Sequence, residues 1–165
     1  MNFENKTAFV TGGGSGIGEA AAVALAARGA HVVVADLNLE NATKVATAIL
    51  NQGGNAIAVL IDVSNANSVD SAFNTAEEWY GDTTHLLVNS AGILGIHAFI
   101  DYPVELFNMV MAVNVTGTFL CSQRAGKSML KAGYGRIVNV ASVSAVRAGI
   151  GRTAYGTSKA AMVGL

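Results

Sequence analysis

The amino-acid sequence predicts an α/β fold with a doubly wound parallel sheet, formed by one domain that spans residues 1–165. Short apolar segments alternate with longer amphipathic ones, at the spacing of strand–helix–strand units. Several of the apolar segments are continuous, as is typical of parallel strands that are buried on both faces. Glycine is frequent, with 19 residues, which indicates tight turns and close approaches of the backbone.

Each element follows from this alternation. The short apolar segments are the predicted strands: residues 7–11, 31–36, 56–61, 86–89 and 136–141. The amphipathic segments are the predicted helices: residues 19–28, 41–51, 68–80, 103–131 and a last helix from about residue 153. Gly29 ends the first helix, Gly53 and Gly54 close the second, and Pro103 suits the first turn of the long helix.

Composition narrows the class of protein. Apolar residues make up 52% of the chain and charged residues 13%, which excludes disorder and predicts a substantial core. The net charge is −1 and no two basic residues are adjacent, so we expect neither nucleic acid nor an anionic membrane as a partner. The first six residues lack the basic-then-apolar pattern of a signal peptide, and no apolar stretch is expected to span a membrane. We therefore expect a cytoplasmic protein.

Cysteine and histidine give no sign of a metal site or a disulfide. The lone Cys121 follows Phe119 and Leu120, which predicts a buried thiol in a helix. The histidines at positions 31, 85 and 97 have no ligand spacing, so no metal is predicted. A Ser-His-Asp hydrolase is also disfavoured, because Ser142 does not lie in a Gly-x-Ser-x-Gly turn.

A glycine-rich turn follows the first predicted strand. Residues 11–18 read Thr-Gly-Gly-Gly-Ser-Gly-Ile-Gly, and glycines at 12, 16 and 18 allow the backbone to approach a phosphate closely. The start of the next helix offers free N–H groups and the positive end of its dipole. No Lys-Ser/Thr pair follows, so a P-loop is excluded. The alternative is a tight connection without a ligand.

Asp36 ends the second predicted strand, where the acid that binds a ribose belongs in a dinucleotide-binding fold. Its carboxylate would repel a 2′-phosphate, by about 4 kcal/mol at ~4 Å and an effective dielectric of ~20. Leu37 follows it and Ser15 lies in the turn, so no basic residue offsets that charge. The pattern favours NAD over NADP. The alternative is that Asp36 caps the next helix.

Tyr155 and Lys159 lie four residues apart, so a helix would place both side chains on one face. An ammonium group beside a phenol favours the phenolate, which is a base that can take a proton from an alcohol. By itself such a pair is also common on a solvated helix face.

In combination these residues resemble the short-chain dehydrogenase/reductase family, in order and along the whole chain. Residues 11–18 resemble its cofactor turn, and Asp62 with Val63 its adenine-contacting pair. Residues 89–92, Asn-Ser-Ala-Gly, resemble its Asn-Asn-Ala-Gly motif with Ser90 as the departure. The resemblance implies a Rossmann-like fold. Members of the family are typically longer, so it also implies that the C-terminal strands, a Pro-Gly segment and the substrate lid of the family are missing here.

The resemblance implies a catalytic set and a cofactor site. Tyr155 is the expected acid/base, Lys159 the residue that supports it and holds the nicotinamide ribose, and Ser142 the donor to the substrate oxygen. Asn114 is expected at a helix irregularity, where it holds a water that feeds protons to Lys159. The cofactor-binding residues so implied are Gly12, Ser15, Gly16, Ile17, Gly18, Asp36, Leu37, Asp62, Val63, Asn89, Ala91, Gly92, Tyr155 and Lys159.

Simpler interpretations exist for four of these residues taken singly. Ser142 would be an ordinary loop serine and Asn114 a helix amide that faces solvent. Asp62 would cap the following turn, and Asn89 would form a turn at the end of a strand.

The resulting hypothesis is an NAD-dependent oxidoreductase that acts on a secondary alcohol or ketone. One alternative is a non-catalytic or unstable truncated fragment that at most binds the dinucleotide, because Ile137, Val138 and Val140 would then lie on an exposed edge. Another is an NADP-dependent 3-ketoacyl reductase, against which Asp36 argues. By resemblance, we expect the full-length form to be a homo-oligomer, either a dimer or a tetramer.

Overall fold

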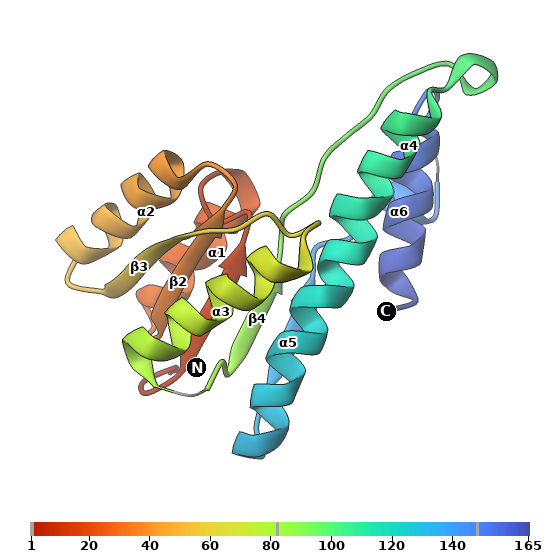
Figure 1. The fold of residues 1–165 in the computed structure, drawn as a ribbon. Helices are drawn as coiled ribbons and strands as arrows, with labels where there is room; N and C mark the ends of the chain where they lie inside the picture. Colours follow the sequence, from red (N-terminus) through yellow and green to blue (C-terminus); the bar gives the residue numbers. More distant parts are fainter. Residues whose placement is uncertain (1, 82, 148) are drawn as a thin grey trace.

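Five parallel strands form one sheet in the computed structural model, which describes residues 2–81, 83–147 and 149–165 (Figure 1). The strand order is β3-β2-β1-β4-β5, and every neighbouring pair is parallel. The predicted doubly wound fold is therefore confirmed. The strands are β1 (Thr7–Thr11), β2 (His31–Asp36), β3 (Asn55–Leu60), β4 (Leu86–Asn89) and β5 (Arg136–Asn139).

Helices cover both faces of this sheet (Figure 1). Alternate residues of each strand point to opposite faces, so β1 contributes Phe9 to one core and Ala8 and Val10 to the other. The first core lies under α3 and α5, where the rings of Phe9 and Phe73 stack with centroids 4.0 Å apart. The second lies under α1 and α2. The α-helices are α1 (Gly16–Ala26), α2 (Leu39–Asn51), α3 (Ala66–Tyr80), α4 (Val104–Met111), α5 (Gly117–Ala132) and α6 (Thr153–Val163).

The predicted boundaries need several corrections: α2 and α3 each begin two residues earlier than predicted, and β3 lies one residue earlier. Helix α1 begins at Gly16 rather than at residue 19, so the end of the glycine-rich segment is its first turn. Strand β5 ends at Asn139, before the predicted residues 140 and 141. The cap of α2 is Asn38, whose side chain accepts a hydrogen bond from Asn41 N at 3.0 Å, so Asp36 is not the cap.

The long predicted helix is divided by a π-helical segment. α4 leads into η2 (Ala112–Thr116), a π-helix, and then into α5, while Pro103 lies just before the first turn rather than in it. α4 packs against α6, and α5 packs against α3 (Figure 1). The chain between these elements also holds two short 3₁₀ turns, η1 (Phe99–Asp101) and η3 (Val143–Ala145).

By length and composition alone, the stretch Val104–Ala132 is long and apolar enough to cross a membrane, with a mean hydropathy of 1.4 in its most apolar 18 residues. The expectation that no apolar stretch reaches that length is therefore wrong. A helix that covers the core of a sheet meets the same criterion, and α5 lies against the sheet, with Cys121 and Ala125 fully buried in the core.

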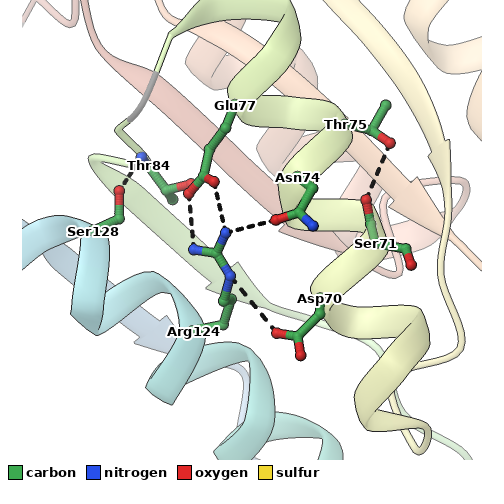
Figure 2. A network of polar contacts seen from close by, with 8 residues as sticks. All are labelled: Asp70, Ser71, Asn74, Thr75, Glu77, Thr84, Arg124 and Ser128. Atoms are coloured by element: carbon green, nitrogen blue, oxygen red, sulfur yellow. Dashed lines mark hydrogen bonds and ion pairs between the residues drawn. The ribbon is translucent and has the colours of Figure 1, made fainter.

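A charged network fastens α5 to α3 (Figure 2). The guanidinium of Arg124 donates to both carboxylate oxygens of Glu77, at 2.8 and 2.6 Å, and to Asn74 Oδ1 at 3.0 Å. Asp70 lies 3.7 Å from Arg124 Nε. Hydrogen bonding to Glu77 raises the pKa of Arg124, so the arginine stays charged. Beside it, Ser128 Oγ accepts from Thr84 N at 3.1 Å, which ties the same helix to the start of β4.

Strand β5 is the edge of the sheet on the side of β4. Ile137 and Val138 are 42% and 55% exposed there, as predicted, while Val140 lies beyond the strand and is half-buried. The core of the sheet is therefore formed by β1, β2 and β4, and the site described below lies at their carboxyl ends.

Candidate functional site

A cleft of about 500 Å³ opens at the carboxyl ends of the strands. Residues that directly follow or end all five strands contribute to its wall, together with η2 and α6. The sheet order reverses between β1 and β4, and ligands of doubly wound sheets bind at this reversal. The lining residues are Gly12, Ser15, Gly16, Ile17, Asp36, Leu37, Ile61, Asp62, Val63, Ser90, Ala91, Gly92, Ile93, Leu94, Val113, Val140, Ala141, Tyr155 and Lys159.

The glycine-rich turn brings backbone, rather than side chains, to the cleft. Gly12 has a φ of 64°, and a Cβ there would lie 2.7 Å from Ala91 N. A Cβ on Gly18 would overlap the carbonyl oxygen of Gly12. Ser15 occupies the cap position of α1 without a capping side-chain bond, so the first amides of the helix are available to an anion. The turn is therefore suited to hold a pyrophosphate.

Asp36 presents its carboxylate at the rim of this turn. Its Oδ2 accepts from Gly14 N and its Oδ1 from Asn38 N, both at 2.9 Å. A carboxylate has about four acceptor positions, so each oxygen keeps capacity for a ribose hydroxyl. Leu37 is 70% exposed beside it, and neither residue brings a positive charge. These contacts fix the position of the carboxylate in the cleft without using up its acceptors.

Asp62 and Val63 line the cleft after β3, as expected. Asp62 Oδ1 accepts from Ser64 N at 2.9 Å and from Ser64 Oγ at 2.6 Å. The simpler interpretation of Asp62 as a turn former therefore describes its contacts as well. The cap of α3 is a different residue, Asn65, which accepts from Ser68 N at 3.1 Å.

Asn89 and Gly18 lie beneath the cleft rather than in its wall. Asn89 is 2% exposed, and its Nδ2 donates to Ser122 Oγ at 3.0 Å and Asn139 Oδ1 at 2.9 Å. These bonds join β4 to α5 and β5, and Asn89 is not among the residues that line the cleft, so its contact with the cofactor stays a prediction. Gly18 is buried against the Gly12 carbonyl, so it shapes the turn without facing the cleft.

The Thr11 side chain holds the segment after β4 that forms part of the cleft wall. Its Oγ1 accepts from Ser90 N at 3.2 Å and from Ala91 N at 3.3 Å. Ala91 and Gly92 thereby bring backbone close to the turn after β1, and both line the cleft as predicted. These bonds involve only the backbone of Ser90, so the change from the family's asparagine leaves them intact.

Asn114 is fully buried in the π-helical segment η2. Its Oδ1 accepts from Ile93 N at 2.8 Å, and its Nδ2 donates to Ile93 O at 3.0 Å and Ser158 Oγ at 2.9 Å. The alternative of a solvent-facing helix amide is therefore wrong. Ser158 in turn donates to Tyr155 O at 2.8 Å. Asn114 thus connects the wall after β4 to helix α6, although it does not line the cleft itself.

Tyr155 and Lys159 both reach the cleft from α6. Lys159 Nζ lies 5.7 Å from the centroid of the Tyr155 ring and donates to Val140 O at 2.6 Å. The lysine is 4% exposed, and burial lowers its pKa. Among the described residues no carboxylate forms an ion pair with it. Lys159 therefore places a buried cation beside the phenol of Tyr155, within the cleft.

Ser142 does not line the cleft. It occupies the cap position of η3, where its Oγ accepts from Ser144 N at 3.1 Å, which matches the simpler interpretation of a loop serine. Its hydroxyl hydrogen remains able to donate, since the bond to Ser144 uses only a lone pair.

Sequence reasoning missed part of the wall. Ile61, Val140 and Ala141 follow strands, and this position was itself a usable signal, because the carboxyl ends of parallel strands meet at one edge. Ile93 and Val113 carried no such signal, since their place depends on how Asn114 joins two distant segments.

In the described part of the chain, the other features do not point to a second site for chemistry. A groove of about 570 Å³ lies under the carboxyl-terminal ends of α1 and α2 and contains none of the predicted site residues. Burial raises the pKa of the Cys121 thiol to about 12, so the thiol stays protonated and unreactive. Within the described ranges, no three His, Cys, Asp or Glu side chains are grouped to hold a metal.

Comparison with known proteins agrees with this geometry. The family model described as short chain dehydrogenase matches residues 6–165. The uncharacterised oxidoreductase YxbG of Bacillus subtilis is 37% identical and is aligned over 98% of this chain and 59% of the relative. The D-threitol dehydrogenase of Mycolicibacterium smegmatis is 38% identical, over 100% of this chain and 64% of the relative.

A third relative carries a different activity in its name. The 3-oxoacyl-[acyl-carrier-protein] reductase of Synechocystis is 38% identical, over 96% of this chain and 64% of the relative. The chain spans about three fifths of the length of these curated relatives.

Proposed function

Because the chain belongs to the short-chain dehydrogenase family, we propose that it acts as an oxidoreductase that uses a nicotinamide dinucleotide and a secondary alcohol or ketone. One observation carries the proposal. Tyr155 and Lys159 line the same cleft as the glycine-rich turn and the Asp36 carboxylate. A base for an alcohol proton and a cradle for a dinucleotide are therefore parts of one site.

The residues present fit such a dinucleotide. The turn around Gly12 leaves no room for a Cβ, the first amides of α1 are open, and Asp36 keeps acceptors for a ribose. When bound, the nicotinamide supplies the hydride chemistry. The chain's own part is to accept the alcohol proton at Tyr155 Oη, with the Lys159 ammonium beside it. The role of Ser142 as donor to the substrate oxygen rests on the family resemblance, because Ser142 itself does not line the cleft. Asn114 holds the wall and helix α6 together during this transfer.

We further propose that the dinucleotide is NAD. Asp36 supports this choice, because its negative charge would face a 2′-phosphate and Leu37 beside it offers no cation. The relative named as a 3-oxoacyl reductase favours a second candidate, an NADP-dependent ketoacyl reductase. The two candidates differ in dinucleotide preference, which makes that preference the first quantity to measure.

The test uses the protein in its natural full length. We expect calorimetry to show NAD binding at least ~10-fold tighter than NADP, and a panel of secondary alcohols beginning with D-threitol to reduce NAD. Tyr155→Phe should lower kcat by about 10²-fold or more. Preference for NADP would refute the Asp36 argument, and no uptake of either dinucleotide would refute the function itself.

The oligomeric state rests on the family resemblance and the location on the sequence, and both stay predictions. We propose pairing of the full-length form through α4–α5 and α6, supported by the exposed apolar side chains of Val104 (65%), Met109 (56%) and Phe119 (46%). Analytical ultracentrifugation would test whether this form is a dimer or tetramer. A cytoplasmic location is likewise proposed, and imaging of the tagged full-length protein in cells would test it.

A further inference from the structure

The ammonium group of Lys159 has three N–H donors, and two of them have partners in the structure. One donates to Val140 O at 2.6 Å and another to the thioether sulfur of Met162 at 3.3 Å. Across the part of the chain that the structure describes, no third acceptor contacts Nζ. The remaining donor belongs to a side chain that lines the cleft.

The position of Met162 in α6 allows this contact. It lies three residues after Lys159, so the two side chains lie on neighbouring positions of one helix face. It is 2% exposed, which keeps water from replacing the sulfur as an acceptor. A thioether is a weak acceptor, so it orients the ammonium without neutralising it or holding it as firmly as an amide or carboxylate would.

We propose that Met162 is a positioning residue for Lys159, whose ammonium it holds together with the Val140 carbonyl so that the third N–H faces the dinucleotide site. The inference rests on the proposed function for the identity of that site. Met162 is not among the residues that line the cleft, so it acts through the lysine.

The surroundings make the thioether important, because few charges face Lys159. Tyr155 is the titratable group of the same helix, and η2 and η3 contribute neutral side chains only. Glu105 on the neighbouring α4 is exposed, while Asp36 ends β2 and Asp62 follows β3, on the other side of β1. Burial lowers the pKa of Lys159, and acceptors such as the sulfur of Met162 oppose that effect.

The experiment titrates Lys159 by NMR in the full-length protein, with lysines labelled with carbon-13 at Cε. The Lys159 signal is assigned as the one that disappears in Lys159→Met. Met162→Leu removes the acceptor at similar volume and should lower the pKa of Lys159 by about 0.5 unit. Met162→Gln supplies a stronger acceptor and should raise it by about as much. Met129→Leu, the same change at a buried methionine of α5, should leave it unchanged.

Activity gives a second readout. If the proposed function holds, the basic limb of kcat against pH should move in the same direction as the NMR titration, to lower pH in Met162→Leu and to higher pH in Met162→Gln. A Lys159 titration that both Met162 variants leave at the wild-type value would overturn the inference. Shifted titrations in a protein that binds no dinucleotide would support the role of Met162 and refute the proposed function instead.

Discussion

Two cations on different helices are held in opposite ways. Arg124 on α5 is 17% exposed and forms a bidentate ion pair with Glu77 on α3, with Asn74 and Asp70 beside it. Lys159 on α6 is 4% exposed, and among the described residues its ammonium has as acceptors only the neutral Val140 carbonyl and Met162 sulfur. The first charge is fully compensated within the protein, and the second is not.

This difference separates what stabilises the fold from what is available for chemistry. A buried cation without a counter-charge costs stability, because its desolvation is not offset by an ion pair. It also keeps its electric field for a neighbouring group, here the phenol of Tyr155. The field of Arg124, in contrast, is offset by the carboxylate of Glu77. We therefore expect substitutions at the two cations to have effects of opposite sign on stability and very different effects on turnover.

The largest effect is expected at Lys159, the cation of the two that the proposed chemistry uses. Lys159→Met should lower kcat by about 10³-fold, since the base loses its ammonium partner, and should raise the free energy of unfolding by about 1 kcal/mol, since a buried charge is removed. Steady-state kinetics and urea unfolding of the full-length protein would measure both. A destabilised Lys159→Met protein would contradict the view that the lysine is held at a cost to stability.

The second prediction concerns the neutral amide that stabilises the same region. Asn114→Leu should lower the free energy of unfolding by about 3 kcal/mol, because the backbone N–H and C=O of Ile93 lose their buried partners. Urea unfolding would measure this. Asn108→Leu on α4 is the control, since its side chain forms no bond among those the structure gives, and a loss as large there would argue for a general helix effect.

The third prediction addresses the compensated cation. Arg124→Met should lower the free energy of unfolding by about 1–2 kcal/mol, because Glu77 is left partly buried and unpaired, while kcat stays at the wild-type value. Denaturant unfolding and kinetics would measure these two quantities. Arg28→Met, at an exposed arginine that bonds only to Ala24 O, should cost less than about 0.5 kcal/mol. A clear drop in kcat for Arg124→Met would show that the two networks are not separate.

The smallest effect is expected at His85, a partly buried group whose environment favours its neutral form, unlike the two cations. Thr7 N donates to His85 Nδ1 at 3.1 Å, and burial, helped by the charge of Lys6, lowers the pKa of His85 from its ordinary value of 6.5. The unfolded chain therefore takes up the proton more readily, so stability is full above pH 6.5 and falls as the pH drops through 6.5 toward the folded pKa.

His85→Asn should preserve the acceptor without the titration. We expect the loss in unfolding free energy between pH 7.5 and pH 5.5 to shrink by about 0.5–1 kcal/mol in this variant, as one hydrogen bond is no longer lost on acidification. Urea unfolding at the two pH values would show it. Burial also lowers the pKa of His31, so part of the wild-type dependence should persist. An unchanged pH dependence would mean that His85 is protonated equally in both states.

The sequence predicted those parts of the fold that local pattern determines. The bounds of β1, β2 and β4 agree with the predicted segments, because each is an apolar run ended by a turn. The early start of α1 was missed because glycines at 16 and 18 have low helix propensity, and here the closeness of the turn outweighs it. The early end of β5 was missed because the Val140 carbonyl turns toward Lys159, a contact between segments 19 residues apart.

The candidate site shows the same division. Asp36 and Asp62 were found because motif and strand position both place them at the cleft, and Tyr155 was found from its four-residue spacing to Lys159. Asn89 lies beneath the cleft because its side chain donates to Ser122, a tertiary partner that leaves no periodic signal in the chain, whereas Ser142 accepts a local bond from Ser144 N. The role of Met162 could not be predicted for a related reason, because a methionine at helical spacing is typical of an ordinary core residue.

The π-helical segment between α4 and α5 links the two regions compared above. Each residue turns a helix by about 100°, so one additional residue in a turn rotates the preceding helix relative to the following one by roughly that angle. In this chain the rotation at the π-helical segment allows one continuous helical stretch of 29 residues to pack α4 against α6 and α5 against α3. Deleting any one residue of 112–116 would regularise the helix and turn one of its two faces away from its partner. This short stretch should therefore tolerate side-chain exchanges far better than changes in length.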